Sequence, residues 1–149
     1  MPNSESNTVD VIDPTSYSIV DHFKVGKLPQ HITPAWDMST LYVDNDKGNS
    51  LTPIDPRTGK PGSAIPVDDP YNLYFTPDGA NAIVVAEQRR RLDSRDPKTW
   101  QVTDSVTVNS LRVGHVHFTA AVKFMVPIDE LSGVVSLLRL PRLQVTKIT

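Results

Sequence analysis

The chain has 149 residues, 38% of them hydrophobic and 21% charged, which suits a single globular domain and excludes a disordered or collagen-like chain. A formal net charge of −2 leaves no basic surface for nucleic acid or an anionic membrane. Because cysteine is absent, disulfides, thiolate nucleophiles and cysteine-ligated metal centres are excluded.

From the sequence we expect neither a targeting segment in residues 1–7 nor a membrane-spanning segment in residues 134–140. Residues 1–7 are polar, with neither a basic segment nor an apolar run, so we expect no signal peptide in this chain. The longest apolar stretch, residues 134–140, is interrupted by Ser136 and Arg139 and is much shorter than the roughly 20 residues that span a bilayer. It is predicted to be a buried strand.

A repeat of about 42 residues runs through the chain. The phrase Val-Ile-Asp-Pro at residues 11–14 returns as Pro-Ile-Asp-Pro at 53–56 and as Ser-Arg-Asp-Pro at 94–97. A second phrase keeps the same spacing and begins at His31, Asn72 and His115. Two markers with one period indicate repeated structural units, and an apolar, β-rich run follows the second marker each time.

Four strands are predicted in the best-marked unit, at residues 71–76, 82–86, 91–95 and 101–108. The first two are joined by the turn Pro77-Asp78-Gly79, in which proline presets φ and glycine accepts a positive φ. A second turn begins at Asp96-Pro97. No helical periodicity is found, and four strands in about 42 residues are typical of a β-propeller blade.

Three segments resemble the YVTN-type β-propeller repeat, the group that includes YncE-like proteins. They are residues 6–13, Leu41-Tyr42-Val43-Asp44-Asn45 and Phe75-Thr76-Pro77-Asp78-Gly79. The resemblance covers residues 6 to about 135 and implies an all-β fold made of blades of four antiparallel strands. It also implies a periplasmic or extracellular location, although this chain shows no leader. It does not specify a function, because the same blade occurs in binding proteins, surface-layer proteins and enzymes.

The length predicts an incomplete propeller of about three and a half blades, since propellers close with about four to eight. The approximate units are 7–30 (partial), 31–70, 71–113 and 114–149 (degenerate). In the last unit Ala120-Ala121-Val122 replaces the Pro-Asp-Gly turn. We therefore expect a fragment of a longer propeller, a truncated reading frame or half of an oligomeric ring. Self-association through open blade faces is also expected, because the apolar residues 137–148 do not form a polar cap.

The candidate ligand-binding residues at the channel mouth are His31, Asn72, Glu87, His115 and His117. Three of them share one repeat position, on the strand that lines the channel in the family's blades. His117 lies two residues after His115, so both belong to the same strand face. Glu87 follows the next strand along the chain and, with Asp129-Glu130, is a possible source of carboxylates at the same rim.

Histidine and carboxylate ligands together suit zinc, iron or manganese. No spacing here has the specificity of a His-Glu-x-x-His motif, so the metal is undetermined and the sequence requires no cofactor. The alternative interpretation is that the histidines bond to backbone or water and seal the channel.

Three further features are given structural interpretations. Asp68-Asp69 is predicted to be a solvated turn, because adjacent side chains point apart, although a catalytic dyad is the alternative. The basic residues 88–91, followed by Asp93 and Arg95, predict cross-strand ion pairs more than an anion site. Trp36 is expected in the core, and Trp100 is expected to be exposed.

The sequence favours a non-enzymatic propeller segment that binds a protein or a small-molecule ligand. It contains neither a Gly-x-Ser-x-Gly nucleophile motif nor a phosphate-binding glycine loop. The alternative function is a hydrolase or lactonase-like enzyme with a metal or acid–base site at the channel mouth. That enzyme would use His31, Glu87, His115 and His117, and an incomplete ring would leave its site incomplete.

Overall fold

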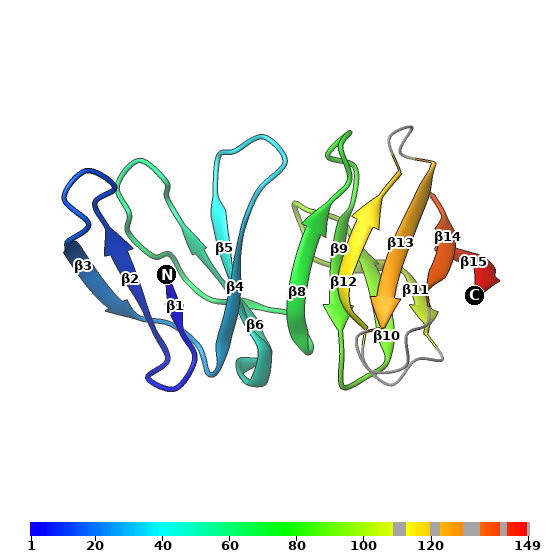
Figure 1. Cartoon of the computed structure of the whole chain (residues 1–149), viewed down its shortest axis with the longest axis horizontal. Coiled ribbons are helices and arrows are strands. Elements are labelled where there is room, and N and C mark those ends of the chain that lie inside the picture. Colours follow the sequence, from blue (N-terminus) through cyan, green and yellow to red (C-terminus); the bar gives the residue numbers. More distant parts are fainter. Residues whose placement is uncertain (109–112, 120–122, 130–134, 141–142, 149) are drawn as a thin grey trace. The chain divides into compact units, whose positions relative to one another are not determined.

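The computed structural model describes residues 1–108, 113–119, 123–129, 135–140 and 143–148 (Figure 1). These residues form four antiparallel sheets of three or four strands and one 3-10 turn, η1 (Asp46–Gly48). The predicted all-β fold of propeller blades is therefore confirmed. No helix among these residues has the length and apolar character that crossing a membrane requires. The chain divides into two compact units, residues 1–71 and 72–149.

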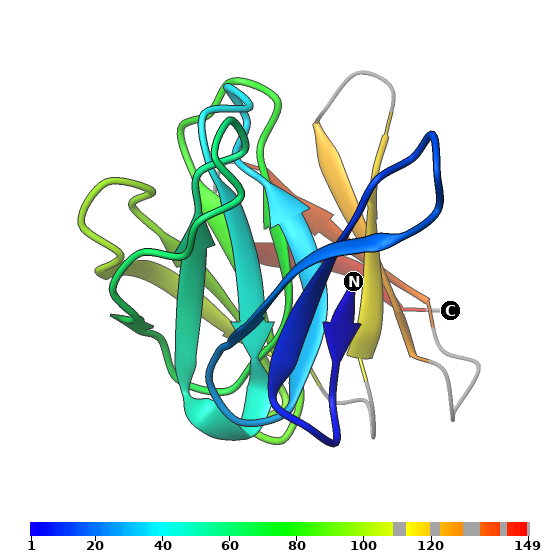
Figure 2. The same cartoon turned by 90° about the vertical axis from the view of Figure 1, so that its left-hand side faces the viewer.

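The first unit contains two sheets (Figure 2). Buried side chains of both sheets form one hydrophobic core. The strands are β1 (Pro2–Asn3), β2 (Thr8–Ile12) and β3 (Ile19–Lys24) in one sheet, and β4 (Pro29–Pro34), β5 (Leu41–Asn45), β6 (Ser50–Ile54) and β7 (Ile65–Pro66) in the other. Val9 of β2 packs with Val43 of β5 and Ile54 of β6, and each is less than 5% exposed. Alternation along each strand places these residues on the facing sides of the two sheets.

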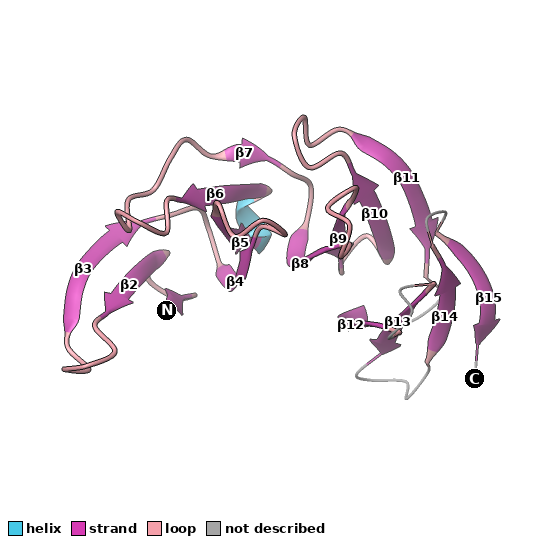
Figure 3. Ribbon diagram, turned by 90° about the horizontal axis from the view of Figure 1, so that it is seen from above, coloured by secondary structure: helices cyan, strands magenta, loops and turns pink. Residues whose placement is uncertain are grey.

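The second unit begins within a strand and contains the remaining two sheets (Figure 3). The strands are β8 (Pro70–Phe75), β9 (Ala82–Ala86), β10 (Arg91–Arg95) and β11 (Val102–Thr107), then β12 (Val113–Phe118), β13 (Phe124–Asp129), β14 (Ser136–Arg139) and β15 (Gln144–Ile148). Within each sheet, strands adjacent in sequence are paired. The four strands predicted between residues 71 and 108 are present, with ends within one residue of those expected. All five residues of β9 are completely buried, which explains its unbroken apolar sequence.

One turn recurs in three sheets and begins at Asp13, Asp55 and Asp96. In each copy the aspartate carbonyl accepts the N–H of the residue four positions later at 2.8 Å, and the carboxylate accepts the N–H two positions later at 2.8 Å. These backbone N–H groups stabilise the charged form and lower the pKa of all three carboxyls. The fifth residue of the turn has a positive φ in every copy: Tyr17 at 57°, Gly59 at 69° and Trp100 at 62°.

Tyr17→Gly is expected to raise the free energy of unfolding by about 0.5–1 kcal/mol. Tyr17 is 84% exposed, so it gains little from packing while its Cβ strains the left-handed backbone. Glycine removes that strain, although its flexible unfolded state offsets part of the gain. Urea denaturation measures the change, with Gly59→Ala as the reverse control, which should destabilise. An unchanged or lower stability of Tyr17→Gly would show that the tyrosine ring makes a stabilising contact.

The two tryptophans lie opposite to the prediction. Trp36 is 55% exposed, because it stands in the β4–β5 turn at the position that Pro77 holds in the β8–β9 turn. Trp100 is only 7% exposed. It ends the Asp96 turn, and its ring meets the ring of Phe75 edge-on at a centroid distance of 6.4 Å. The Trp100 ring is therefore buried beside the last residue of β8.

Candidate functional site

The five residues predicted for the channel mouth are divided between the two units. His31 lies on β4 in the first unit and is half-buried. Its Nδ1 is 2.9 Å from the carbonyl oxygen of Tyr71, and the two rings meet edge-on at 5.4 Å. Since a carbonyl only accepts, this contact requires the proton to be on Nδ1. His31 therefore makes the backbone hydrogen bond that the alternative interpretation describes.

Asn72 and His115 come together in the second unit, with Tyr74 between them; we call these three residues the His115 cluster. The amide Nδ2 of Asn72 lies 3.0 Å from the Tyr74 hydroxyl and 3.4 Å from the carbonyl oxygen of Gly114. The Nδ1 of His115 is 3.5 Å from both the Asn72 amide and the Tyr74 hydroxyl. The Tyr74 hydroxyl also accepts the N–H of Val116 at 3.1 Å. Side-chain polar contacts thus join β8 to β12.

Strand alternation explains how the His115 cluster forms. Asn72 and Tyr74 are two residues apart and share one face of β8, while Leu73 between them is 1% exposed and faces the core. On β12, His115 and His117 are exposed and Val116 between them is 3% exposed. The result is a hydrogen-bonded polar base, in which Asn72 is buried, with two imidazoles at the surface. Tyr74 was not among the residues predicted for this site, although its position two residues after Asn72 places it on the same strand face.

Of the carboxylates predicted near this site, only that of Glu87 belongs to the described side chains. Glu87 is half-buried and directly follows β9, and its carbonyl accepts the N–H of Arg90 at 3.1 Å to form a turn. The hairpin between β8 and β9 brings this turn to the end of the sheet where β8 begins. The Asp129 side chain and Glu130 lie outside the described residues. Within the described ranges, no three His, Asp or Glu side chains form a group that could hold a metal ion.

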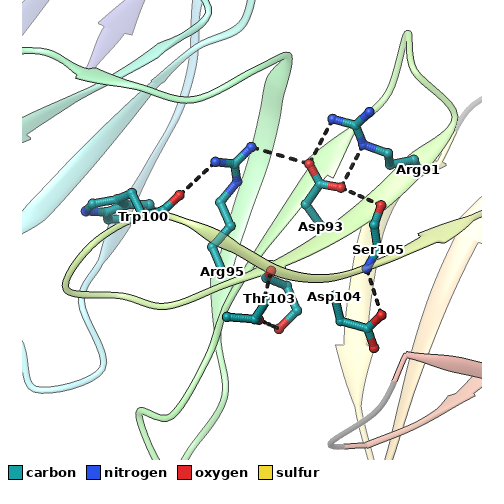
Figure 4. A network of polar contacts seen from close by, with 8 residues as sticks. Arg91, Asp93, Arg95, Trp100, Thr103, Asp104 and Ser105 are labelled. Carbon is teal, nitrogen blue, oxygen red and sulfur yellow. Dashed lines mark hydrogen bonds and ion pairs between the residues drawn. The ribbon is translucent and has the colours of Figure 1, made fainter.

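A network of charged residues lies on one face of β10 (Figure 4). Asp93 is completely buried and accepts two bonds from Arg91, at 2.7 Å from Nε and 3.0 Å from Nη2. Its carboxylate also accepts the Ser105 hydroxyl at 2.7 Å and lies 3.4 Å from Nη2 of Arg95. Arg95, 7% exposed, donates to the carbonyl of Trp100 at 2.8 Å.

The predicted ion pairs are therefore present, but those of Asp93 run along one strand instead of crossing between strands. Asp93 and both of its arginine partners lie along β10 itself. Residues two positions apart share a strand face, and the long arginine side chains reach along it. The cross-strand neighbour of Asp93 is Ser105, a hydroxyl rather than a charge.

The YNCE-like beta-propeller family matches residues 1–129 of this chain. The chain belongs to the YncE-like β-propeller family. The solved structures similar to it include hydrazine synthase of Kuenenia stuttgartiensis, with 20% identity and a TM-score of 0.82 over 98% of this chain and 44% of that one. Another is a functionally unknown protein from Desulfotomaculum acetoxidans DSM 771, with 17% identity and a TM-score of 0.75 over 97% of this chain and 51% of that one. No curated protein matches.

The YncE-like chain thus spans about half the length of these two solved proteins. At 20% identity or below, the likeness shows the fold alone. The function has to be argued from the side chains of this chain.

The YncE-like chain also buries an acidic residue that the sequence analysis treated only as part of a signature. Asp44 on β5 is completely buried, and neither carboxylate oxygen has a hydrogen-bond partner among the described residues. Burial raises the pKa of this carboxyl well above its ordinary value. Asp44 is paired with the buried Leu51, as Val85 is paired with Leu92 in the next sheet. An apolar residue therefore stands at the equivalent position.

The turn predicted at Asp68-Asp69 is only partly solvated. Asp69 is 4% exposed and has a positive φ of 51°. Its backbone N–H donates to Oδ1 of Asn49 at 2.9 Å. This bond ties the loop to the β5–β6 turn. The hydrophilic sequence did not indicate the burial of Asp69.

Proposed function

We propose that this YncE-like segment is a non-enzymatic binding scaffold that recognises a protein or a small polar ligand through the His115 cluster. The observation that supports the proposal is the pair of exposed imidazoles, His115 and His117, beside a buried and hydrogen-bonded Asn72. Polar groups that are already fixed lose little conformational entropy when a ligand binds. A ligand group that donates or accepts hydrogen bonds, such as a carboxylate or an amide, fits this chemistry.

Nuclear magnetic resonance with small probes tests this proposal. Acetate and acetamide, titrated separately into the labelled chain, are expected to shift the amide signals of Asn72, Tyr74 and residues 113–118. His115→Ala should weaken the response about 10-fold or more, which corresponds to about 1.4 kcal/mol. His22→Ala is the matched control, because His22 is also exposed but lies on β3. The proposal would be contradicted if His115→Ala and His22→Ala bound the probes equally well, or if neither probe shifted these signals in the wild type.

The second candidate function is a hydrolase or lactonase-like enzyme with a metal or acid–base site. The observation that favours it is that His115 and His117 are both exposed on one face of β12. This enzyme would use Glu87, from the same unit, as a carboxylate. Metal analysis of the purified protein separates the two functions, because stoichiometric zinc, iron or manganese that is lost in His115→Ala and His117→Ala would favour the enzyme.

A further inference from the structure

Two asparagines anchor the loop that follows the outer strand of each sheet in the first unit. Asn7 and Asn49 have positive φ angles of 58° and 47°. Their carbonyls accept the backbone N–H groups of Val25 and Val67, at 3.0 and 3.1 Å. Their side-chain Oδ1 atoms accept a second N–H from the same loops, at 2.8 and 2.9 Å. Asparagine suits this role because it tolerates the left-handed region and carries an acceptor.

Arg90 occupies the equivalent place in the β9–β10 turn. Its φ is 53°, and its carbonyl accepts the N–H of Val108 at 2.9 Å, so the backbone half of the anchor is kept. A guanidinium carries only donors, so the side-chain half cannot form. Arginine is also less tolerant than asparagine of a positive φ. Arg90 therefore keeps the backbone hydrogen bond of the turn. Its side chain cannot make the second bond that the asparagines accept, and its positive φ adds backbone strain.

The same turn directs positive charge into solvent. The side chain of Arg90 is exposed, whereas the guanidinium of the next residue, Arg91, contacts Asp93. With Glu87 counted, residues 87–90 carry two positive charges and one negative, a net charge of +1. Guanidinium groups bind carboxylates and phosphates with paired, parallel hydrogen bonds. A position that breaks a local structural rule without a structural gain is where a functional role is expected.

From these observations we propose that residues 87–90, the arginine turn, bind an oxyanion group of a small ligand, with Arg90 as the principal contact. The shared chemistry is that of a phosphate or a carboxylate. This proposal is independent of the His115 cluster, because it rests on a different turn and on different side chains.

Arg90→Asn is the decisive variant, because it restores the anchoring residue and removes the cation at once. Its thermal midpoint is expected to equal or exceed that of the wild type, while oxyanion binding weakens about 10-fold or more. Binding is measured at low ionic strength from the backbone amide signals of residues 87–90 in both proteins and from the Arg90 Nε–Hε signal in the wild type. Inorganic phosphate is used in one titration and succinate in the other. A response to only one probe identifies that anion as the ligand group, and a response to both supports a general oxyanion site.

Lys47→Ala provides the matched control, since Lys47 is exposed in the equivalent β5–β6 turn and its removal changes the net charge equally. Oxyanion binding should be unchanged in this variant. The proposal is overturned if neither anion affects Arg90 in the wild type, or if Arg90→Asn binds as the wild type does. It is equally overturned if Lys47→Ala loses as much binding, or if Arg90→Asn is less stable than the wild type, because the guanidinium would then have a structural role.

Discussion

Asp93→Ala is expected to lower the free energy of unfolding by about 3–5 kcal/mol, the loss typical of a broken buried ion pair. Asp93 is completely buried, and its removal leaves the guanidinium of Arg95, which is 7% exposed, without its carboxylate. The cost of losing the carboxylate is smaller for Arg91, because its side chain is 32% exposed and can turn toward water. Urea denaturation at neutral pH measures the change.

Two control variants isolate the effect of the unpaired charge. The double variant Asp93→Leu with Arg95→Met removes both buried charges and should lose less stability than Asp93→Ala alone. Glu5→Ala removes an exposed carboxylate and should change the stability by less than about 0.5 kcal/mol. A loss below about 1 kcal/mol for Asp93→Ala would show that water or relaxation compensates the arginines.

Asp44→Val is expected to raise the free energy of unfolding by about 2 kcal/mol at neutral pH. The wild type buries a carboxyl group whose two oxygens have no hydrogen-bond partner among the described residues. Valine, the residue at the equivalent position 85, is similar in size and carries no polar atom. Asp44→Asn is the control, because it removes the ionisation but keeps a buried polar group, and it should gain less.

The effect of Asp44 should depend on pH in a defined direction. Its pKa in the folded state lies above the ordinary value of 3.8, so between those two values the unfolded chain holds fewer protons than the folded one. Wild-type stability contributed by this group is thus fully present below about pH 3.8 and declines as the pH rises toward the folded pKa. The advantage of Asp44→Val should grow over the same range. A constant difference from pH 4 to pH 8 would contradict the raised pKa.

Local signals in the sequence were sufficient to predict the blades. The strand at 82–86 is an unbroken apolar run, and Asp96 closes its turn through bonds within five residues, so both are determined by near neighbours. Repeat equivalence also pointed to Asn72 and His115, which the structure brings within 3.5 Å of each other. These features depend on period and turn chemistry, which a single sequence displays.

The features that the sequence did not predict depend on what lies opposite each side chain. Asp44 sits in an apolar signature, but its burial without a partner follows from the sheet around it. Trp100 is buried because Phe75, distant in sequence, lies beside its ring. The sequence also did not indicate that Arg90 shares the positive φ of Asn7 and Asn49 and lacks their side-chain acceptor. The repeat period and the composition of the sequence do not predict contacts of this kind between distant residues.

In the turn that begins at Asp13, Asp55 and Asp96, the hydrogen bonds that close the turn do not involve the side chain of its fifth residue. The same two hydrogen bonds close all three copies, yet the fifth residue is a tyrosine, a glycine or a tryptophan. The three side chains differ in exposure, because Tyr17 is 84% exposed whereas Trp100 is 7% exposed and packs on Phe75. A substitution at Tyr17 therefore changes the surface of its sheet, and one at Trp100 changes buried packing. The exposed copy at Tyr17 is thus a place where recognition residues can be grafted without altering the two hydrogen bonds that close the turn.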